Sequence, residues 1–193
     1  MNFIVSTTSL LKSLQTISGV INSSSVLPIL EDFLFEIKNG KMTVFATDLE
    51  TSMSTELNVE SKDNVRIAIP AKIILETLKA LPEQPISINI DEISFGIEIT
   101  SDNGKYKLTG ENGEDFPKIP QQEDTQKVSF ASSILNMAIS KTLFAVSNDE
   151  LRPAMTGVLF QLNEDGITFV ATDAHKLVKF NRKDVSVAEN TSF

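Results

Sequence analysis

Residues 166–177 read GITFVATDAHKL, and residues 41–50 read KMTVFATDLE, an earlier version of the same stretch. An offset of 125 positions places Thr43 on Thr168 and aligns the two ATD triplets without a gap. The same offset places Pro28 on Pro153. Similarity at a fixed period indicates a duplicated structural unit. The sequence therefore predicts two copies of one domain in tandem.

The repeat divides the 193 residues unequally. We expect a complete first domain over 1–120, a linker over 121–126, and the first half of a second copy over 127–193. A complete second copy would extend to roughly residue 250. The sequence therefore reads as a fragment of a longer protein.

The composition excludes several kinds of site. The chain has no cysteine, which rules out disulfides and thiolate metal sites. It has no basic leader and no run of about 20 apolar residues, so a soluble, cytoplasmic protein without a membrane segment is expected. Glycine-rich phosphate loops, nucleophile elbows and metal-ligand spacings are also missing from the sequence.

Hydrophobic periodicity predicts the secondary structure of the first copy. Two helices are expected, over 9–21 and 71–80. Strands are expected over 2–6, 32–38, 41–47, 54–59, 65–69, 86–90, 95–99 and 106–108. Asn39-Gly40 is a strong hairpin signal between the second and third of these strands.

The second copy restarts the pattern after a polar stretch over 110–126, which reads as the linker. We expect a strand over 127–130, a helix from 132 to about 146, and strands over 154–162, 167–172 and 175–181. The fold class is therefore α+β, built from tandem strand-helix-three-strand units with helices on one face of antiparallel sheets.

The charges are distributed unevenly. The chain carries a net charge of −9, but the expected helices carry Lys12, Lys72, Lys79 and Lys141 against Glu76 alone. These helices suit a surface near phosphates, although four lysines also fit a chance distribution. A plain DNA-binding module would show salt-sensitive affinity for linear DNA, and the net charge speaks against it.

Catalysis is the competing hypothesis, as a small metal- or acid/base-dependent hydrolase centred on Asp173 and His175. His175 is the only histidine, so a metal or acid/base site lacks further ligands. The first copy keeps the aspartate as Asp48 but has Glu50 in place of the histidine. An aspartate that ends a strand commonly accepts backbone amides of the next turn, and we favour that structural interpretation.

Two stretches offer binding surfaces. Residues 172–177, with Met155, could form a shallow apolar patch with a polar rim that suits a linear peptide, or a core strand with Leu177 inward. Tyr106 and Leu108 could belong to a sheet edge that pairs with another subunit, or to a core strand.

Six motifs in this order resemble the bacterial sliding clamp, the β subunit of DNA polymerase III. They are LPIL at 27–30, ATDLE at 46–50, IPAK at 69–72, EDFP at 114–117, GVLF at 157–160 and VATDAHKL at 170–177. The resemblance implies the DNA-clamp fold, in which helices line a hole for duplex DNA and sheets form the outside. It also implies a non-enzymatic homodimeric ring of three-domain subunits, so the third domain is absent here.

The resemblance also implies partners and sites, and it implies no catalytic residue, metal or cofactor. Expected partners are double-stranded DNA, the DNA polymerase III α subunit, the clamp loader and other clamp-binding-motif proteins. The implied peptide-binding residues are Met155, Thr172, Ala174, His175, Lys176 and Leu177, where the family usually has glycine at 174 and arginine at 176. The implied DNA-facing residues are Lys72, Lys79 and Arg152, with Lys12 and Lys141 added from the helix faces. The implied subunit interface contains Tyr106 and Leu108.

Overall fold

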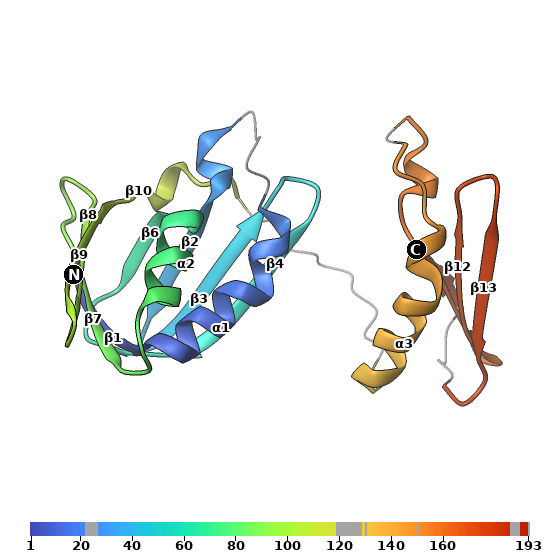
Figure 1. Ribbon diagram of the computed structural model, residues 1–193, viewed down its shortest axis with the longest axis horizontal. Coiled ribbons are helices and arrows are strands. Elements are labelled where there is room, and N and C mark those ends of the chain that lie inside the picture. Colours follow the sequence, from blue (N-terminus) through green and yellow to red (C-terminus); the bar gives the residue numbers. More distant parts are fainter. Residues whose placement is uncertain (22–26, 119–128, 130, 150, 186–189, 193) are drawn as a thin grey trace. The chain divides into compact units, whose positions relative to one another are not determined.

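The computed structural model describes residues 1–193 except 22–26, 119–128, 130, 150, 186–189 and 193. The chain divides into two compact units, Met1–Gln121 and Gln122–Phe193, each described here by itself (Figure 1). The expected linker over 121–126 lies outside the described residues. So does the strand expected over 127–130, apart from Ser129.

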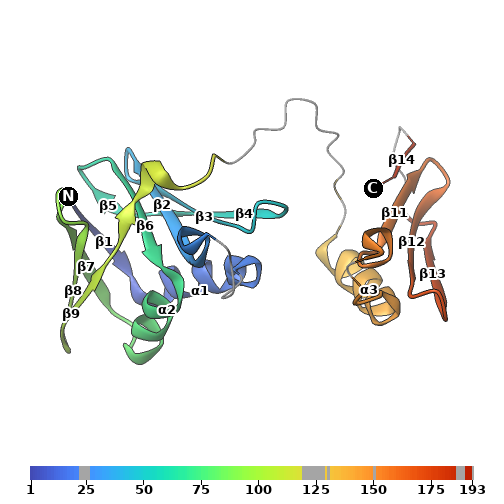
Figure 2. The same ribbon diagram turned by 90° about the horizontal axis from the view of Figure 1, so that it is seen from above.

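The first unit contains two five-stranded antiparallel sheets, with orders β5-β1-β7-β8-β9 and β10-β6-β2-β3-β4. The strands of the first sheet are β1 (Asn2–Ser6), β5 (Glu60–Ser61), β7 (Pro85–Ile90), β8 (Gly96–Ser101) and β9 (Gly104–Thr109). The strands of the second are β2 (Asp32–Lys38), β3 (Lys41–Thr47), β4 (Ser52–Asn58), β6 (Val65–Pro70) and β10 (Glu111–Asn112). The 3-10 turn η2 (Pro28–Glu31) leads into β2. Figure 2 shows the helices α1 and α2 together on one side of this unit.

Helix α1 (Thr7–Ile17) begins two residues earlier than the sequence predicts. The Ser6 hydroxyl accepts the amide N–H of Ser9 at 3.4 Å and caps the helix start. The α-helix ends at Ile17, and its last turn tightens into the 3-10 helix η1 (Ser18–Val20). The prediction of a helix over 9–21 therefore began and ended too late along the chain.

Helix α2 (Ala71–Ala80) has the predicted bounds. Pro70 precedes its first residue, and Ala71, Ile74 and Leu78 form the buried stripe. The Asn39-Gly40 turn is also confirmed, since both residues have positive φ (52° and 75°) as a two-residue hairpin turn requires.

One hydrophobic core joins both sheets and both helices of the first unit. Alternate residues of the strands point into it, as Phe33, Phe35 and Ile37 of β2 illustrate. Leu10 and Leu14 of α1 enter the same core and are fully buried. The helices thus keep one face on the core and leave the other exposed.

The second sheet is also covered on its outer face. Phe116 lies on Leu34 and Ala68, just after the 3-10 turn η3 (Gly113–Asp115). A Cβ on Gly110 would stand 2.6 Å from the carbonyl oxygen of Ala68, so glycine permits the close approach of this segment. The prediction of a linker from residue 110 was wrong over these residues, because β10 and η3 pack onto the sheet.

The second unit contains helix α3 (Ser132–Thr142) and one sheet of order β13-β12-β11-β14. Its strands are β11 (Leu159–Asn163), β12 (Gly166–Thr172), β13 (Leu177–Arg182) and β14 (Thr191–Ser192). Three expected bounds were wrong. The α-helix ends at Thr142 and continues as the 3-10 helix η4 (Leu143–Ala145). Pro153 opens the 3-10 helix η5 (Pro153–Met155), so β11 begins at Leu159 and not at residue 154. A turn precedes β13, which begins at Leu177 and not at residue 175.

The offset of the sequence repeat is reproduced in three dimensions. It carries the bounds of α1 onto those of α3, and those of β3 onto those of β12. The register is also kept, because Leu34 opposes Phe45 in the first unit and Leu159 opposes Val170 in the second. The predicted duplication and the α+β class are confirmed. None of the helices in the described ranges is long and apolar enough to cross a membrane.

Candidate interaction sites

The turn between β12 and β13 contains most of the candidate peptide-binding residues. The Thr172 hydroxyl donates to the carbonyl oxygen of Lys176 at 2.7 Å and accepts the amide N–H of Ala174 at 3.1 Å. Oδ1 of Asp173 accepts the amide N–H groups of His175 at 3.0 Å and Lys176 at 2.8 Å. The side chains of Thr172, the last residue of β12, and of Asp173 therefore hold the turn together.

The first unit repeats this turn between β3 and β4. The Thr47 hydroxyl donates to the carbonyl oxygen of Thr51 at 3.0 Å and accepts the amide N–H of Leu49 at 3.1 Å. Oδ1 of Asp48 accepts the amide N–H groups of Glu50 at 3.0 Å and Thr51 at 2.6 Å. The structural interpretation of the repeated aspartate is confirmed.

The electrostatics of Asp173 argue against the hydrolase alternative. The pKa of Asp173 lies well below its usual range. The largest cause is the hydrogen bond from Nζ of Lys176 to Oδ2, and the backbone N–H groups of Lys176 and His175 lower the pKa further. A general base or acid at neutral pH needs a carboxyl whose pKa is raised toward 7. The described residues also contain no group of three His, Cys, Asp or Glu side chains that could hold a metal ion.

The outer side of the turn presents Ala174, His175, Lys176 and Leu177 to solvent. Leu177 is 67% exposed, so the alternative of a core strand with Leu177 inward was wrong. An exposed leucine next to a histidine and a lysine forms an apolar patch with a polar rim. The ammonium group of Lys176 is already paired with Asp173, which fixes its position over the turn.

Met155 belongs to η5, which lies near the same end of the sheet as the turn, because Leu159 at the start of β11 opposes Val170 near the end of β12. Its side chain is half-buried, and its carbonyl oxygen accepts the amide N–H of Ser147 at 2.8 Å. Within the described residues, no hydrogen bond joins Met155 to the turn. The structure thus joins residues 172–177 directly and brings Met155 only to the same edge.

The candidate DNA-facing lysines lie on exposed helix faces. Lys12 of α1 and Lys72 and Lys79 of α2 are exposed, and none of the three forms an ion pair within the described residues. Lys72 and Lys79 are two turns apart and share one stripe of α2 with Glu76 between them. Because α1 and α2 contact each other (Figure 1), these lysines lie on one helical layer.

The two cationic candidates of the second unit differ. Lys141 lies in the last turn of α3, where a cation interacts favourably with the helix dipole. Arg152 instead donates from Nε to Oδ2 of Asp149 at 2.8 Å. This bond lowers the pKa of Asp149, so much of the charge of Arg152 is neutralised within its own loop.

The candidate interface residues Tyr106 and Leu108 lie on β9, whose one partner among the described strands is β8. Their side chains are half-buried against the core of the first unit. On the opposite face of β9, Lys105 and Lys107 form ion pairs with Glu98 at 2.7 and 3.6 Å. The strand β9 is therefore a sheet edge with one face on the core, and pairing of this edge with another subunit stays a prediction.

Two structural features were missed from the sequence. Asp32 is 5% exposed, and its Oδ2 atom has no hydrogen-bond partner within the described residues. Burial and the nearby carboxylates of Glu111 and Glu31 raise its pKa to about 7. The signal was an acidic residue that opens an otherwise apolar strand pattern.

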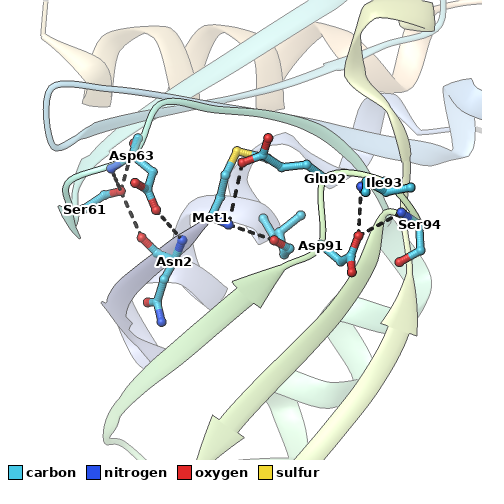
Figure 3. Close-up of polar contacts among 9 residues, drawn as sticks. Met1, Asn2, Ser61, Asp63, Asp91, Glu92, Ile93 and Ser94 are labelled. Atoms are coloured by element: carbon cyan, nitrogen blue, oxygen red, sulfur yellow. Dashed lines mark hydrogen bonds and ion pairs between the residues drawn. The ribbon is translucent and has the colours of Figure 1, made fainter.

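The second missed feature is a polar network at the start of β1, drawn in Figure 3. The amino group of Met1 donates to the carbonyl oxygen of Ile90 at 2.9 Å and lies 4.0 Å from the carboxylate of Glu92. The amide N–H of Asn2 donates to Oδ2 of Asp63 at 2.9 Å. These groups anchor β1 on both sides, so they serve folding rather than a ligand.

Comparison with known proteins supports one family along the chain. A family model described as DNA polymerase III beta subunit, N-terminal domain, matches residues 1–120. A second, described as the central domain of the same subunit, matches residues 129–191.

Relatives and solved structures agree with these matches. Beta sliding clamps of Halalkalibacterium halodurans and Vibrio cholerae are 30% and 28% identical over 92% of this chain, and both alignments cover 48% of the relative. A putative DNA polymerase III beta subunit from Eubacterium rectale superposes with a TM-score of 0.93 at 26% identity, over 100% of this chain and 52% of that one. The corresponding subunit of Thermotoga maritima gives 0.90 at 27% identity, with the same coverage. The chain spans about half the length of the curated relatives it matches.

Proposed function

The chain belongs to the DNA polymerase III beta subunit family, and on that premise we propose that it forms part of a sliding clamp that encircles duplex DNA. In this role the protein tethers the replicative polymerase for processive synthesis. It does so by topology and docking, without catalysing a reaction.

The observation that carries the proposal is the order of two similar units along one chain. The first unit matches the N-terminal domain of the family and the second matches the central domain, in the order that the family has. A chance resemblance of one α+β unit would not reproduce the second unit at a constant offset.

The charge distribution supports a sliding contact with DNA. Lys12, Lys72 and Lys79 are unpaired within the described residues and lie on the exposed side of the helical layer. Each phosphate that a lysine neutralises adds affinity and salt dependence. A few cations on an acidic protein attract the duplex without holding it at one place.

We assign the docking of partner proteins to the turn residues 172–177 with Met155. The exposed Leu177 offers an apolar anchor beside backbone groups fixed by Thr172 and Asp173. Such a rigid patch suits a short linear motif. The partners that this assigns are the DNA polymerase III α subunit, the clamp loader and other clamp-binding-motif proteins.

We assign closure of a homodimeric ring to the β9 edge. Tyr106 and Leu108 keep their side chains on the core, while no described strand pairs with the outer edge of β9, which could pair with a strand of a second subunit. The DNA-facing role extends to Lys141 and, more weakly, to Arg152, whose guanidinium is paired with Asp149.

The test is topological retention on DNA. Residues 1–193 would replace the matching half of the Halalkalibacterium halodurans clamp, and the chimera would be loaded onto nicked circular DNA by the clamp loader of that organism. We expect the chimera to stay on the circle in high salt and to leave when a restriction enzyme linearises the DNA. The unaltered clamp is the matched control.

Salt-sensitive binding that is indifferent to linearisation would contradict the proposal and favour an ordinary DNA-binding module. The hydrolase alternative has its own test, because Asp173→Asn would abolish any turnover. A clamp would lose only part of the stability of one turn, roughly 1 kcal/mol per hydrogen bond.

A further inference from the structure

A cover, defined as residues 110–116, lies on the outer face of the second sheet. It begins directly after β9, and its first residues include β10, which pairs with β6 (Figure 1). Phe116 closes the far end by packing on Leu34 and Ala68. The cover is part of the first unit, and the chain beyond it leads into the second.

The cover lies directly against the sheet. A Cβ on Gly113 would stand 2.8 Å from the backbone carbonyl carbon of Arg66, so the two backbones are in contact. Nε of Arg66 donates to the carbonyl oxygen of Gly113 at 3.1 Å and lies 3.2 Å from the carboxylate of Glu114. The guanidinium also forms an ion pair with Glu36 of β2. Side chains beneath the cover are therefore shielded from water while it is closed.

Asp32, the first residue of β2, lies on the face that the cover protects. Side chains two positions apart point to the same face of a strand, so Asp32 shares the face of Leu34. Asp32 is 5% exposed, and its Oδ2 atom has no hydrogen-bond partner within the described residues. Burial without a partner costs far more for a carboxylate than for a neutral carboxyl group. The closed cover therefore favours the protonated form of Asp32.

The surroundings of Asp32 also oppose its ionisation. Opposite it are Pro70 of β6 and, continuing the register of β2 and β3, Thr47 of β3, and neither is charged. Its charged neighbours within the described residues are Glu111 in the cover and Glu31 in η2. Burial, and then the charges of these two carboxylates, raise the pKa of Asp32 to about 7.

We propose that the cover is a proton-linked latch, which stays closed over Asp32 while that carboxyl group holds a proton and opens when it ionises. Opening admits water to Oδ2 and moves Glu111 away from it, so the open state favours the carboxylate. Closure of the cover and binding of the proton therefore favour each other.

The latch sets the free length of chain between the two units. With the cover closed, the chain leaves the first unit at Phe116, and with the cover open it leaves at Thr109, the last residue of β9. The released residues add at most about 25 Å of reach when fully extended. This device lies within the first unit and does not depend on the function proposed above.

Acid closes the latch. Asp32 should ionise near its ordinary pKa of 3.8 when the cover is open and near about 7 when it is closed. The opening constant should therefore rise as the pH increases from about 4 to about 7 and stay level above that. For a single group with these two values, the rise between about pH 5 and about pH 7 amounts to about fiftyfold.

The experiment is hydrogen exchange of the 193-residue chain, followed by mass spectrometry at several pH values. Amides of the cover should be less protected than those of β2 and β3, because they exchange through a local opening. Their protection factors, which already allow for the effect of pH on intrinsic exchange, should fall about fiftyfold from about pH 5 to about pH 7.

Three variants separate the latch from other effects of pH. Asp32→Asn keeps the shape of the side chain without its titration, so the cover should stay equally protected at both pH values. Asp115→Asn, on the exposed part of the cover, is the matched control and should keep the full pH response. Glu111→Gln should reduce the response, since it removes a charge that opposes ionisation of Asp32.

Two results on the unaltered chain would overturn the proposal, whatever the stability of the variants. In the first, protection of the cover does not change with pH, so Asp32 does not control its opening. In the second, the cover is as well protected as β2 and β3, so it opens only when the whole unit unfolds. A full pH response that persists in Asp32→Asn would overturn the proposal as well, because another group would then be responsible.

Discussion

Ala174 shows how a single backbone angle shapes the turn between β12 and β13. Its φ is 73°, and its counterpart Leu49 has a φ of 79°. A non-glycine residue in this left-handed region carries a steric cost of roughly 1–2 kcal/mol. Both turns tolerate the cost because the threonine and aspartate before them bind the backbone on either side.

We therefore expect Ala174→Gly to raise the free energy of unfolding by about 0.5–1 kcal/mol, since glycine adopts this φ without strain. Thermal or urea unfolding measures the change. Ala154→Gly is the control, because Ala154 is exposed and has a negative φ, and it should not stabilise the protein. Equal effects of the two substitutions would show that the strain at residue 174 is not real.

Leu177 is the residue on which peptide affinity should depend most. We expect Leu177→Asp to weaken binding of a labelled clamp-binding-motif peptide at least about tenfold, which corresponds to about 1.4 kcal/mol. Because 67% of the side chain is exposed, the unfolding midpoint should change little. Fluorescence anisotropy on the chimeric clamp measures the affinity, with Lys179→Asp on the same strand as control. Unchanged binding would remove Leu177 from the site.

Asp32 makes the stability of the first unit depend on pH. Its pKa is raised from 3.8 to about 7. Between these two pH values, Asp32 therefore keeps its proton in the folded state and loses it in the unfolded state. The stability that this group contributes should be fully present below about pH 4, should be lost as the pH rises from 4 through about 7, and should change no further above that. At roughly 1.4 kcal/mol per pKa unit, the loss is at most about 4 kcal/mol.

Asp32→Asn should therefore flatten the pH dependence of unfolding and raise stability above neutral pH. Urea unfolding of the two proteins from acid to alkaline pH provides the comparison, with the exposed Asp115→Asn as a charge-matched control. If the free energy of unfolding changed with pH in the same way for Asp32→Asn and the unaltered chain, Asp32 would have a hydrogen-bond or ion-pair partner in solution.

At the scale of elements, the segment after β9 acts as a cover for the second sheet. Phe116 is 2% exposed and fills the outer face over Leu34 and Ala68. The segment is also held by the pairing of β10 with β6 and by a hydrogen bond from Nε of Arg66 to the carbonyl oxygen of Gly113 at 3.1 Å.

Phe116→Ala should accordingly lower the free energy of unfolding by about 3 kcal/mol or more, as expected for loss of a buried phenylalanine. The same truncation at Ile93, which is 93% exposed, should change it by less than about 0.5 kcal/mol. Calorimetric or chemical unfolding checks both. A loss at Phe116 as small as that at Ile93 would show that the segment is not docked in solution.

At the scale of the whole molecule, the proposed contact with DNA brings an acidic chain close to an acidic polymer. The net charge of −9 opposes binding, and the lysines of the helical layer provide local attraction. Such a balance yields weak contacts that can be exchanged rapidly, which suits a protein held on DNA by topology.

In the chimeric clamp, Lys72→Gln combined with Lys79→Gln should reduce the slope of log affinity against log salt by about 2, if both lysines meet phosphates. Lys62→Gln, in the connection between β5 and β6, is the control and should leave the slope unchanged. A slope insensitive to the double substitution would move the DNA path away from α2.

The sequence determined the local and repetitive features of this protein. Periodicity located α2 to the residue, the Asn39-Gly40 signal located a hairpin, and the repeated ATD triplet correctly predicted a structural turn. These features depend on neighbours within a few positions, so a pattern in the chain is sufficient to reveal them.

Only the tertiary structure decided features that depend on residues far apart in the chain. Phe116 is buried because β6 and β2 lie beneath it, and Oδ2 of Asp32 is buried where no donor of the described residues reaches it. Leu177 is exposed because it begins β13 on the face of the strand opposite to Phe180, which packs on the core. Burial and hydrogen-bond pairing arise only when distant segments pack together, so the spacing of residues along the chain does not reveal them.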